Sequence, residues 1–405
     1  MEPRHLAFCP RYLFGSQALD SLVPFCREIG LQEKNAVLIS DATTWKVAAE
    51  RISESLRGSG FRVETSIVEN GAVRSEVEKA REKIRLLRPC IVLGIGGGVS
   101  MDVAKASAFL ESARWITVPT SFSTDAMTGI NATFRGEKRG VDDKAHDGDY
   151  DIRVGPPLAC IVDTDIVREA PWRFQAAGFA DYLGKVCATY DWTLAYSRGK
   201  DPVYSEYAIM LAEAQVEYLM KNASRIRKKD QGAFDAFLQI MVNDGFLTQV
   251  AGSSRILFGS DHVVAQGLME EQVRLNIKGL HGEQVGLGTV MMAYLQGQDW
   301  VAVKKALEEI GAPVTAEQVG LDDEAVIRAL TRAKAINESW MRDRPDIYTI
   351  VMEKPLTRES AKQIAEETGV IASQWYLHIC SARFPSAASQ CSRTACGETY
   401  RAMPP

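Results

Sequence analysis

Long apolar runs, an excess of basic charge and closely spaced cysteine pairs are all missing from this 405-residue chain. No apolar run approaches the ~20 residues of a membrane-spanning helix, so we expect no span. Lys and Arg number 47 against 52 Asp and Glu. This mild acidity argues against nucleic acid as the main partner, because phosphate backbones bind to basic surfaces. The N-terminus has no basic segment followed by an apolar one, so no secretory signal is expected.

The eight cysteines are scattered along the chain without any CxxC pair. In a chain of this length the pattern favours reduced thiols over a disulfide framework, and it predicts a cytoplasmic protein. Cys391 and Cys396 lie in a polar C-terminal stretch, where we expect their thiols to be more exposed than the others.

Short apolar runs alternate with amphipathic stretches over the first 165 residues. The pattern predicts strands at 35–41, 61–70, 90–98, 115–121 and 158–167, and helices that begin near 42, 75 and 99. Strand–helix alternation at this pitch is typical of a parallel sheet with helices on both faces. The first 165 residues are therefore predicted to form an α/β domain.

The pattern changes after about Pro171, where apolar residues recur every three to four positions. This spacing predicts an all-helical region over 166–371. The remaining stretch, 372–405, is rich in Ser, Ala, Arg and Cys with little periodicity, and is predicted to be a weakly ordered tail.

A glycine cluster separates a predicted strand from a predicted helix in the segment IVLGIGGGVSMDVAK, which contains Gly96, Gly97 and Gly98. Glycines let a backbone approach a ligand closely, and the N-terminus of the following helix offers unpaired N–H groups to a phosphate. The spacing is neither G-x-G-x-x-G nor a P-loop. A tight turn that binds nothing is therefore the alternative interpretation.

Three charged residues near these elements are further candidates. Asp102 and Lys105 lie three positions apart on one helical face, so Lys105 could reach a phosphate or, alternatively, form a surface ion pair. Asp41 ends the first long strand, where a carboxylate can accept hydrogen bonds from an adenosine ribose and repel a 2′-phosphate. It could equally cap the following helix, and the two roles are compatible.

A possible metal-binding set lies in the helical region. Of five histidines, His262 and His281 have the most informative contexts, and Asp181 precedes them near the start of an apolar helix. One carboxylate and two imidazoles suit Zn²⁺, Fe²⁺ or Ni²⁺, and three protein ligands leave positions open for a substrate. Each histidine alone could instead be an ordinary core or surface residue.

Five segments taken together resemble a known superfamily: GIGGGVSMDVAK, VPTSFSTDA, AAGFADYLGKVCATYDWTLA, GSSRILFGSDH and LHGEQVGLGTVMM. They are similar to the iron-containing alcohol dehydrogenases, glycerol dehydrogenases and dehydroquinate synthases, and most of all to the sn-glycerol-1-phosphate dehydrogenase branch. The resemblance covers roughly residues 5–371. It implies a dinucleotide-binding domain over 1–165 and a helical metal- and substrate-binding domain over 166–371, with the active site between them.

The resemblance also implies roles for individual residues. The implied metal ligands are Asp181, His262 and His281. The implied NAD(P) contacts are Gly96, Gly97, Gly98, Ser100, Thr120 and Ser121, with Asp102 and Lys105 on the nicotinamide side. Asp125 matches a family aspartate near the substrate hydroxyls, and with Lys105 it is the expected catalytic residue. For the substrate phosphate we expect Lys185 and Arg255.

Three departures from the family pattern stand out. Asp261 precedes the first metal histidine where relatives often have glutamate, and Gln266 stands where they commonly carry a second histidine, a candidate proton relay. The segment after the STDA sequence is also longer and more polar than usual in the branch, which could reshape the substrate pocket.

The expected reaction is reversible hydride transfer between NAD(P)H and dihydroxyacetone phosphate, giving sn-glycerol 1-phosphate, with a divalent metal as Lewis acid. The proton would pass through metal-bound solvent or ribose hydroxyls. The resemblance further implies a homo-oligomer and a role in phospholipid biosynthesis. The alternatives are a dehydrogenase for another polyol or alcohol, a cyclase like dehydroquinate synthase, and an inactive metal- and nucleotide-binding homologue.

Overall fold

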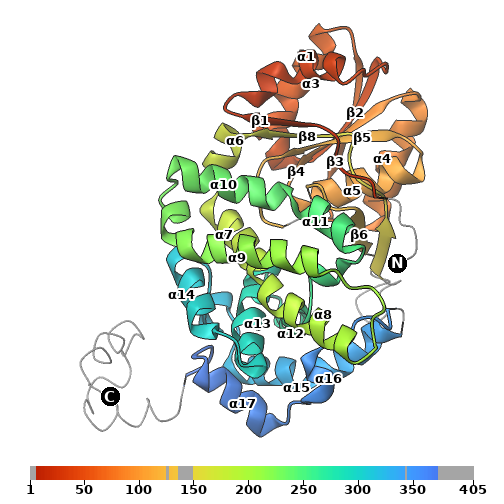
Figure 1. Ribbon diagram of the computed structural model, residues 1–405. Coiled ribbons are helices and arrows are strands. Elements are labelled where there is room, and N and C mark those ends of the chain that lie inside the picture. Colours follow the sequence, from red (N-terminus) through yellow and green to blue (C-terminus); the bar gives the residue numbers. More distant parts are fainter. Residues whose placement is uncertain (1–5, 125–126, 136–148, 343, 373–405) are drawn as a thin grey trace.

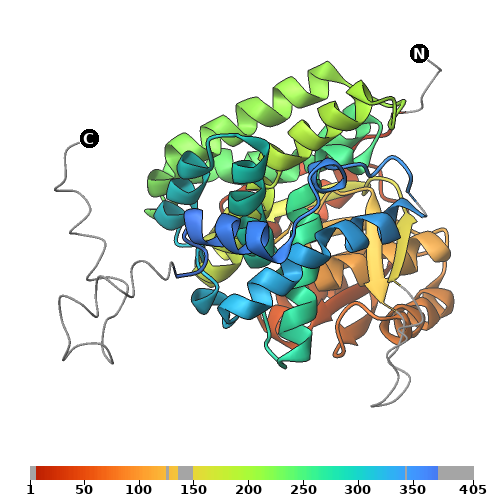
Figure 2. The same ribbon diagram turned by 90° about the horizontal axis from the view of Figure 1, so that it is seen from below.

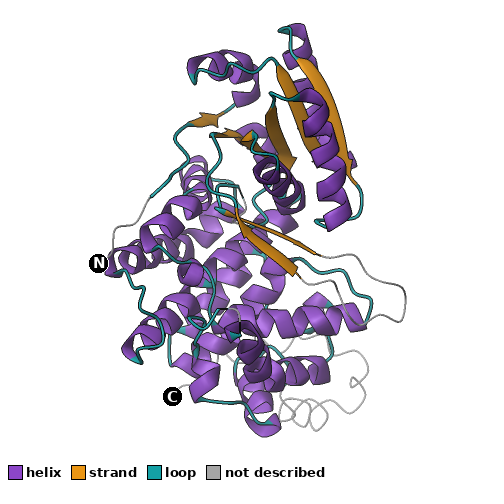
Figure 3. Cartoon of the chain, turned by 90° about the vertical axis from the view of Figure 1, so that its right-hand side faces the viewer, coloured by secondary structure: helices purple, strands orange, loops and turns teal. Residues whose placement is uncertain are grey.

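A computed structural model describes residues 6–124, 127–135, 149–342 and 344–372. Within these residues the strands lie in the N-terminal part of the chain, and a bundle of helices follows (Figure 1). Figure 3 shows the sheet at one end of the molecule and the helical part at the other. This arrangement confirms the expected α/β fold followed by an all-helical region.

A six-stranded parallel sheet in the order β1-β8-β5-β4-β2-β3 forms the centre of the α/β part. The strands are β1 (Tyr12–Gly15), β2 (Asn35–Asp41), β3 (Arg62–Val68), β4 (Ile91–Gly96), β5 (Arg114–Pro119) and β8 (Ala159–Asp163). All six residues of β4 and all five of β8 are buried. Such continuous burial is typical of a parallel sheet that is covered on both faces.

Alternate residues of β2 point to the two covered faces. Leu38 packs in a cluster with Leu22 and Ile52, whereas Val37 and Ile39 pack in a separate cluster. The helices of the α/β part are α1 (Leu22–Glu28), α2 (Ala42–Thr44), α3 (Glu50–Gly58), α4 (Arg74–Leu87) and α5 (Gly98–Leu110). Helices α1 and α3 cover one face, and α4 and α5 cover the other.

Two features of this part were not expected from the sequence. The four-residue strand β1 forms one edge of the sheet, where it pairs with β8. An antiparallel hairpin of β6 (Asn131–Arg135) and β7 (Asp149–Arg153) also forms in the long polar segment. Ala132 and Phe134 of β6 pack among residues of α4 and α5. The hairpin therefore depends on tertiary burial that its local sequence does not reveal.

The change from strands to helices falls between Asp163 and Thr164. The helices that follow are α6 (Thr164–Glu169), α7 (Trp172–Leu183), α8 (Lys185–Ser197), α9 (Glu206–Arg227), α10 (Gln231–Val242), α11 (Asp244–Ala251), α12 (Ser260–Arg274), α13 (His281–Gln296), α14 (Trp300–Ile310), α15 (Asp323–Met341), α16 (Ile350–Glu353) and α17 (Arg358–Glu367). Viewed from below, these helices lie in front of the α/β part (Figure 2). Helix α13 packs against α7, α12 and α14, so its position sets the geometry of its neighbours.

Among the described residues, no helix is both long and apolar enough to cross a membrane. Cys9, Cys26, Cys90, Cys160 and Cys187 are buried free thiols, as the sequence predicted for reduced cysteines. The expected tail lies outside the described residues from 373 onward, and so do Cys391 and Cys396.

Candidate functional site

A cleft of about 1840 Å³ is lined by residues from both parts of the molecule. On one side lie the loops that follow β2, β4 and β5, and on the other lie residues of α7, α8, α11, α12 and α13. Pockets for drug-sized molecules usually measure ~300–1,000 Å³. This cleft therefore has room for an extended ligand together with a second, smaller one.

The glycine loop forms one wall of the cleft. Gly97 precedes the first turn of α5, and Gly97, Gly98 and Ser100 line the cavity. Gly96 does not line it, but has a φ of 141°, and a Cβ there would lie 3.0 Å from the Ser100 hydroxyl. Only glycine adopts this conformation without strain. The loop therefore directs a helix N-terminus of positive partial charge into the cleft, and Thr120 and Ser121 add hydroxyls beside it.

Asp41 lines the cleft and also caps a helix. Its Oδ1 accepts hydrogen bonds from the backbone N–H groups of Thr43 (2.8 Å) and Thr44 (3.0 Å). The capping role that the sequence allowed is therefore confirmed. Because the residue also faces the cavity, the geometry remains compatible with contact to a ribose.

Asp102 and Lys105 form an ion pair of 3.2 Å, as their spacing predicted. The Lys105 side chain is only 1% exposed, so the alternative of a surface ion pair is wrong. Its ammonium also donates to the backbone oxygen of Asn131 at 2.8 Å. Lys105, which lines the cleft, thus ties hairpin β6–β7 to helix α5.

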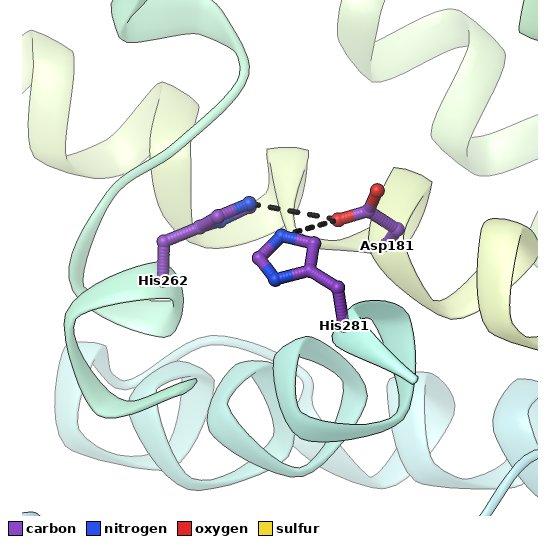
Figure 4. Close-up of side chains that lie close together, drawn as sticks. All are labelled: Asp181, His262 and His281. Atoms are coloured by element: carbon purple, nitrogen blue, oxygen red, sulfur yellow. Dashed lines mark ion pairs between the residues drawn. The ribbon is translucent and has the colours of Figure 1, made fainter. Parts of the chain in front are cut away.

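Asp181, His262 and His281 meet at the helical side of the cleft (Figure 4). They come from α7, from α12 and from the first residue of α13. The Nε2 atoms of His262 and His281 lie 3.5 Å and 3.6 Å from the same oxygen, Oδ1 of Asp181. One ligand atom from each residue falls within 4.8 Å of the others. The convergence predicted from the sequence is thereby confirmed, and the donor set fits a divalent transition metal.

The charges around these residues are strongly coupled. Burial alone would lower the pKa of His262, but the carboxylates of Asp261 and Asp181 raise it to about 10. Burial opposes ionisation of Asp181, yet the two histidines and Lys185 hold the pKa of its carboxyl below the usual value. The two carboxylates thus favour a positive charge on the His262 imidazole, and a divalent cation held by the same three side chains would satisfy them in its place.

The two cations expected for the substrate phosphate lie in different places. Lys185 lines the cleft, with its ammonium 3.0 Å from Asp244 Oδ1 and 3.5 Å from the ring centre of Tyr182. Arg255 is fully buried, does not line the cleft, and donates to the backbone oxygen of Tyr348 at 2.8 Å. The role expected for Arg255 at the substrate is therefore wrong, because its guanidinium is enclosed in the helical part.

Several polar cleft residues had no signal in the sequence. Asp244, Thr248 and Ser254 line the cavity on or just after α11. Only the structure identifies Asp244 as a residue of the cleft, because its buried ion pair is with Lys185, 59 positions away in the sequence. Gln266 also lines the cavity, and its amide donates to Glu270 at 3.1 Å. Asp125, the expected substrate contact, lies outside the described residues.

Comparison with known proteins shows which family the chain belongs to. Residues 13–171 match the family model for iron-containing alcohol dehydrogenase. Over 375 residues the chain is 36% identical to the glycerol-1-phosphate dehydrogenase [NAD(P)+] of Thermococcus kodakarensis, covering 92% of this chain and 100% of the relative. The corresponding protein of Hyperthermus butylicus is 36% identical over 89% of this chain and 97% of its own. The crystal structure of glycerol dehydrogenase from Schizosaccharomyces pombe superposes with a TM-score of 0.71, at 20% identity over 95% of this chain and 94% of that chain.

Proposed function

Since the chain belongs to the iron-containing alcohol dehydrogenase family, in the branch of the glycerol-1-phosphate dehydrogenases, we propose that it interconverts dihydroxyacetone phosphate and sn-glycerol 1-phosphate with NAD(P)H. The observation that carries the proposal is the placing of Asp181, His262 and His281 in the same cleft as the glycine loop. A redox cofactor and a substrate that share this cavity could meet at the three side chains.

The cofactor is held by the α/β wall of the cleft in this proposal. The N–H groups of Gly97 and Gly98, at the start of α5, would bind the pyrophosphate. The carboxylate of Asp41 would accept a hydrogen bond from the adenosine ribose. Asp102 and Lys105, further along α5, would adjoin the nicotinamide, where their ion pair fixes both side chains.

The substrate is held by the helical wall. Asp181, His262 and His281 would hold a divalent metal ion, which when bound supplies a Lewis acid that polarises the substrate carbonyl. Lys185 would attract the substrate phosphate, because the residue lines the cleft and its positive charge acts on Asp181. The Ser254 hydroxyl, which accepts from Arg344 at 3.3 Å, provides an uncharged donor on the same wall. Asp125 remains the proposed contact for a substrate hydroxyl.

Proton delivery must differ from relatives that carry a second histidine. Gln266 has no titratable nitrogen, and its amide is directed to Glu270. We therefore assign the proton to solvent in the cleft or to the ribose hydroxyls of the cofactor. General acid catalysis by a positioned side chain would need a group that titrates near neutral pH, and Gln266 cannot supply one.

The direct test is an assay of the purified protein with NADH or NADPH, a divalent metal salt and dihydroxyacetone phosphate. We expect consumption of the reduced cofactor and a product that is sn-glycerol 1-phosphate and not its enantiomer. Dihydroxyacetone, which lacks the phosphate, is the matched control and should react much more slowly. Binding of metal and cofactor without turnover of any triose phosphate would contradict the proposal. Parallel assays with Zn²⁺, Fe²⁺ and Ni²⁺ identify the metal that supports activity.

Replacing Asp41 with glycine is expected to relax any preference for NADH over NADPH. The carboxylate repels a 2′-phosphate, so its removal should shift the ratio of kcat/KM values by about tenfold, equivalent to ~1.4 kcal/mol. Loss of the cap itself should cost only a few tenths of a kcal/mol, because glycine is tolerated at this helix position. Steady-state kinetics with both cofactors measures the ratio.

Asp230→Gly provides a matched control for loss of a helix cap. The Asp230 side chain accepts from the Ala233 N–H at the start of α10 and does not line the cleft. Its replacement should leave the cofactor ratio unchanged. An unaltered ratio in Asp41→Gly would mean that Asp41 acts only as a cap.

A further inference from the structure

We infer that Asp261 is a positioning residue that directs the Nε2 atom of His262 toward the metal site. The inference rests on the proposed metal site and concerns a residue next to it in sequence. In this arrangement the Asp261 carboxylate accepts the Nδ1–H of His262. The second nitrogen of the ring is then left unprotonated as a metal ligand.

The two nitrogens of His262 have separate partners. Nδ1 lies 2.6 Å from Oδ2 of Asp261, whereas Nε2 lies 3.5 Å from Oδ1 of Asp181. A neutral imidazole has one donor and one acceptor nitrogen, and the partner of one decides the state of the other. A carboxylate next to Nδ1 accepts a hydrogen bond and cannot donate one. Asp261 therefore selects the tautomer that has its lone pair on Nε2.

Asp261 is itself held in place. The residue is fully buried, and its second oxygen, Oδ1, accepts the backbone N–H of Gly259 at 3.0 Å. It lies in the first turn of α12, where the helix dipole favours a negative charge. Both carboxylate oxygens are thus engaged, one by the backbone and one by the imidazole. A carboxylate fixed in this way cannot rotate away from His262 without losing a buried hydrogen bond.

The backbone at Gly184 passes close to the Asp261 carboxylate. Gly184, which joins α7 to α8, lies so close that a Cβ there would be 2.5 Å from Oδ2 of Asp261. The same Cβ would be 3.0 Å from the backbone oxygen of Asp181. The absence of a side chain at position 184 thus admits the Asp261 carboxylate between His262 and the helix that bears Asp181.

Release of Zn²⁺ from the loaded protein tests the inference, with Asp261→Asn as the variant. Asparagine keeps the shape but removes the charge that increases imidazole basicity. Loss of such a partner typically costs ~10–100-fold in metal affinity. We expect Zn²⁺ to dissociate about 10–100-fold faster into excess chelator, and the d–d absorption of the Co²⁺-loaded protein to change. The dissociation rate is the chosen readout because it starts from the metal-loaded state.

Asp191→Asn is the matched control. Asp191 is also fully buried, and it accepts the backbone N–H of Ser260 at 2.6 Å, next to Asp261 in the chain. A faster release from Asp261→Asn alone supports the inference. Equal release from Asp261→Asn and the parent, or equal acceleration in both variants, overturns it. Failure of the parent protein to retain Zn²⁺ would instead overturn the metal site on which the inference rests.

A measurement on the unsubstituted protein covers the case in which Asp261→Asn does not fold. In ¹⁵N spectra of the Zn²⁺-loaded protein, His262 should show a protonated Nδ1 and a metal-bound Nε2. Coordination through Nδ1 would overturn the inference whatever the behaviour of the variant.

Discussion

Replacement of His281 with alanine is expected to abolish metal retention and to lower turnover by roughly a thousand-fold or more, equivalent to ~4 kcal/mol of lost transition-state stabilisation. The variant removes one of the two imidazoles whose Nε2 atoms lie 3.5 Å and 3.6 Å from Asp181 Oδ1, and with it one of the three proposed ligands. The His281 side chain is 37% exposed, so its removal leaves no large internal cavity and the fold should persist. Metal analysis of the purified variant, turnover with dihydroxyacetone phosphate and circular dichroism together measure these effects.

Lys278→Ala is the appropriate control for His281→Ala. Lys278 is exposed, lies shortly before His281 in the same loop and does not line the cleft. The control should retain both metal and activity. Full activity of His281→Ala after removal of metal with a chelator would show that the ligand assignment is wrong.

Replacement of Gly282 with alanine is expected to disturb the proposed metal site without changing any of its three proposed ligands. A Cβ at this position would lie 1.9 Å from the backbone oxygen of Ala177 on α7. Helices α7 and α13 would have to separate, and overpacking of this kind typically costs ~1–3 kcal/mol. The separation would move His281, at the start of α13, away from Asp181 on α7. We expect both a lower melting temperature and a lower affinity for Zn²⁺.

Gly232→Ala is the matched control, because it replaces a helical glycine by alanine without pushing two helices apart. A Cβ at position 232, in α10, would meet nothing closer than Asp230 Oδ1 at 3.9 Å. Alanine there should be neutral or stabilising, because it favours a helix over glycine by ~1 kcal/mol. An unchanged metal affinity in Gly282→Ala would mean that the α7–α13 contact does not control the spacing of the ligands.

The resemblance of five segments to a known family predicted that Asp181, His262 and His281 would lie close together. The sequence alone could not give the arrangement of the helices that brings them together. Asp181, His262 and His281 belong to three helices, and only the packing of α7, α12 and α13 brings their side chains within 4.8 Å. Contacts with a distant segment also explain why the role expected for Arg255 is wrong. An arginine in a polar segment is expected to be a surface cation, whereas the Arg255 side chain is fully buried and its guanidinium donates to the backbone oxygen of Tyr348.

Local sequence by itself determined the alternating strands and helices of the first part, the glycine turn before α5 and the capping role of Asp41. Each of these depends on neighbours within a few positions, where backbone sterics and short hydrogen bonds decide the conformation. The tertiary structure alone decided the pairing of β1, the hairpin β6–β7, the burial of Lys185 against Asp244 and the contact of Asp261 with the ring of His262. In these cases the interacting residues are far apart in the sequence, or are neighbours whose contact depends on the direction in which the side chains point. Because a buried charge is costly unless it is paired, burial also determines that Lys185 lies against Asp244 and Asp261 against His262.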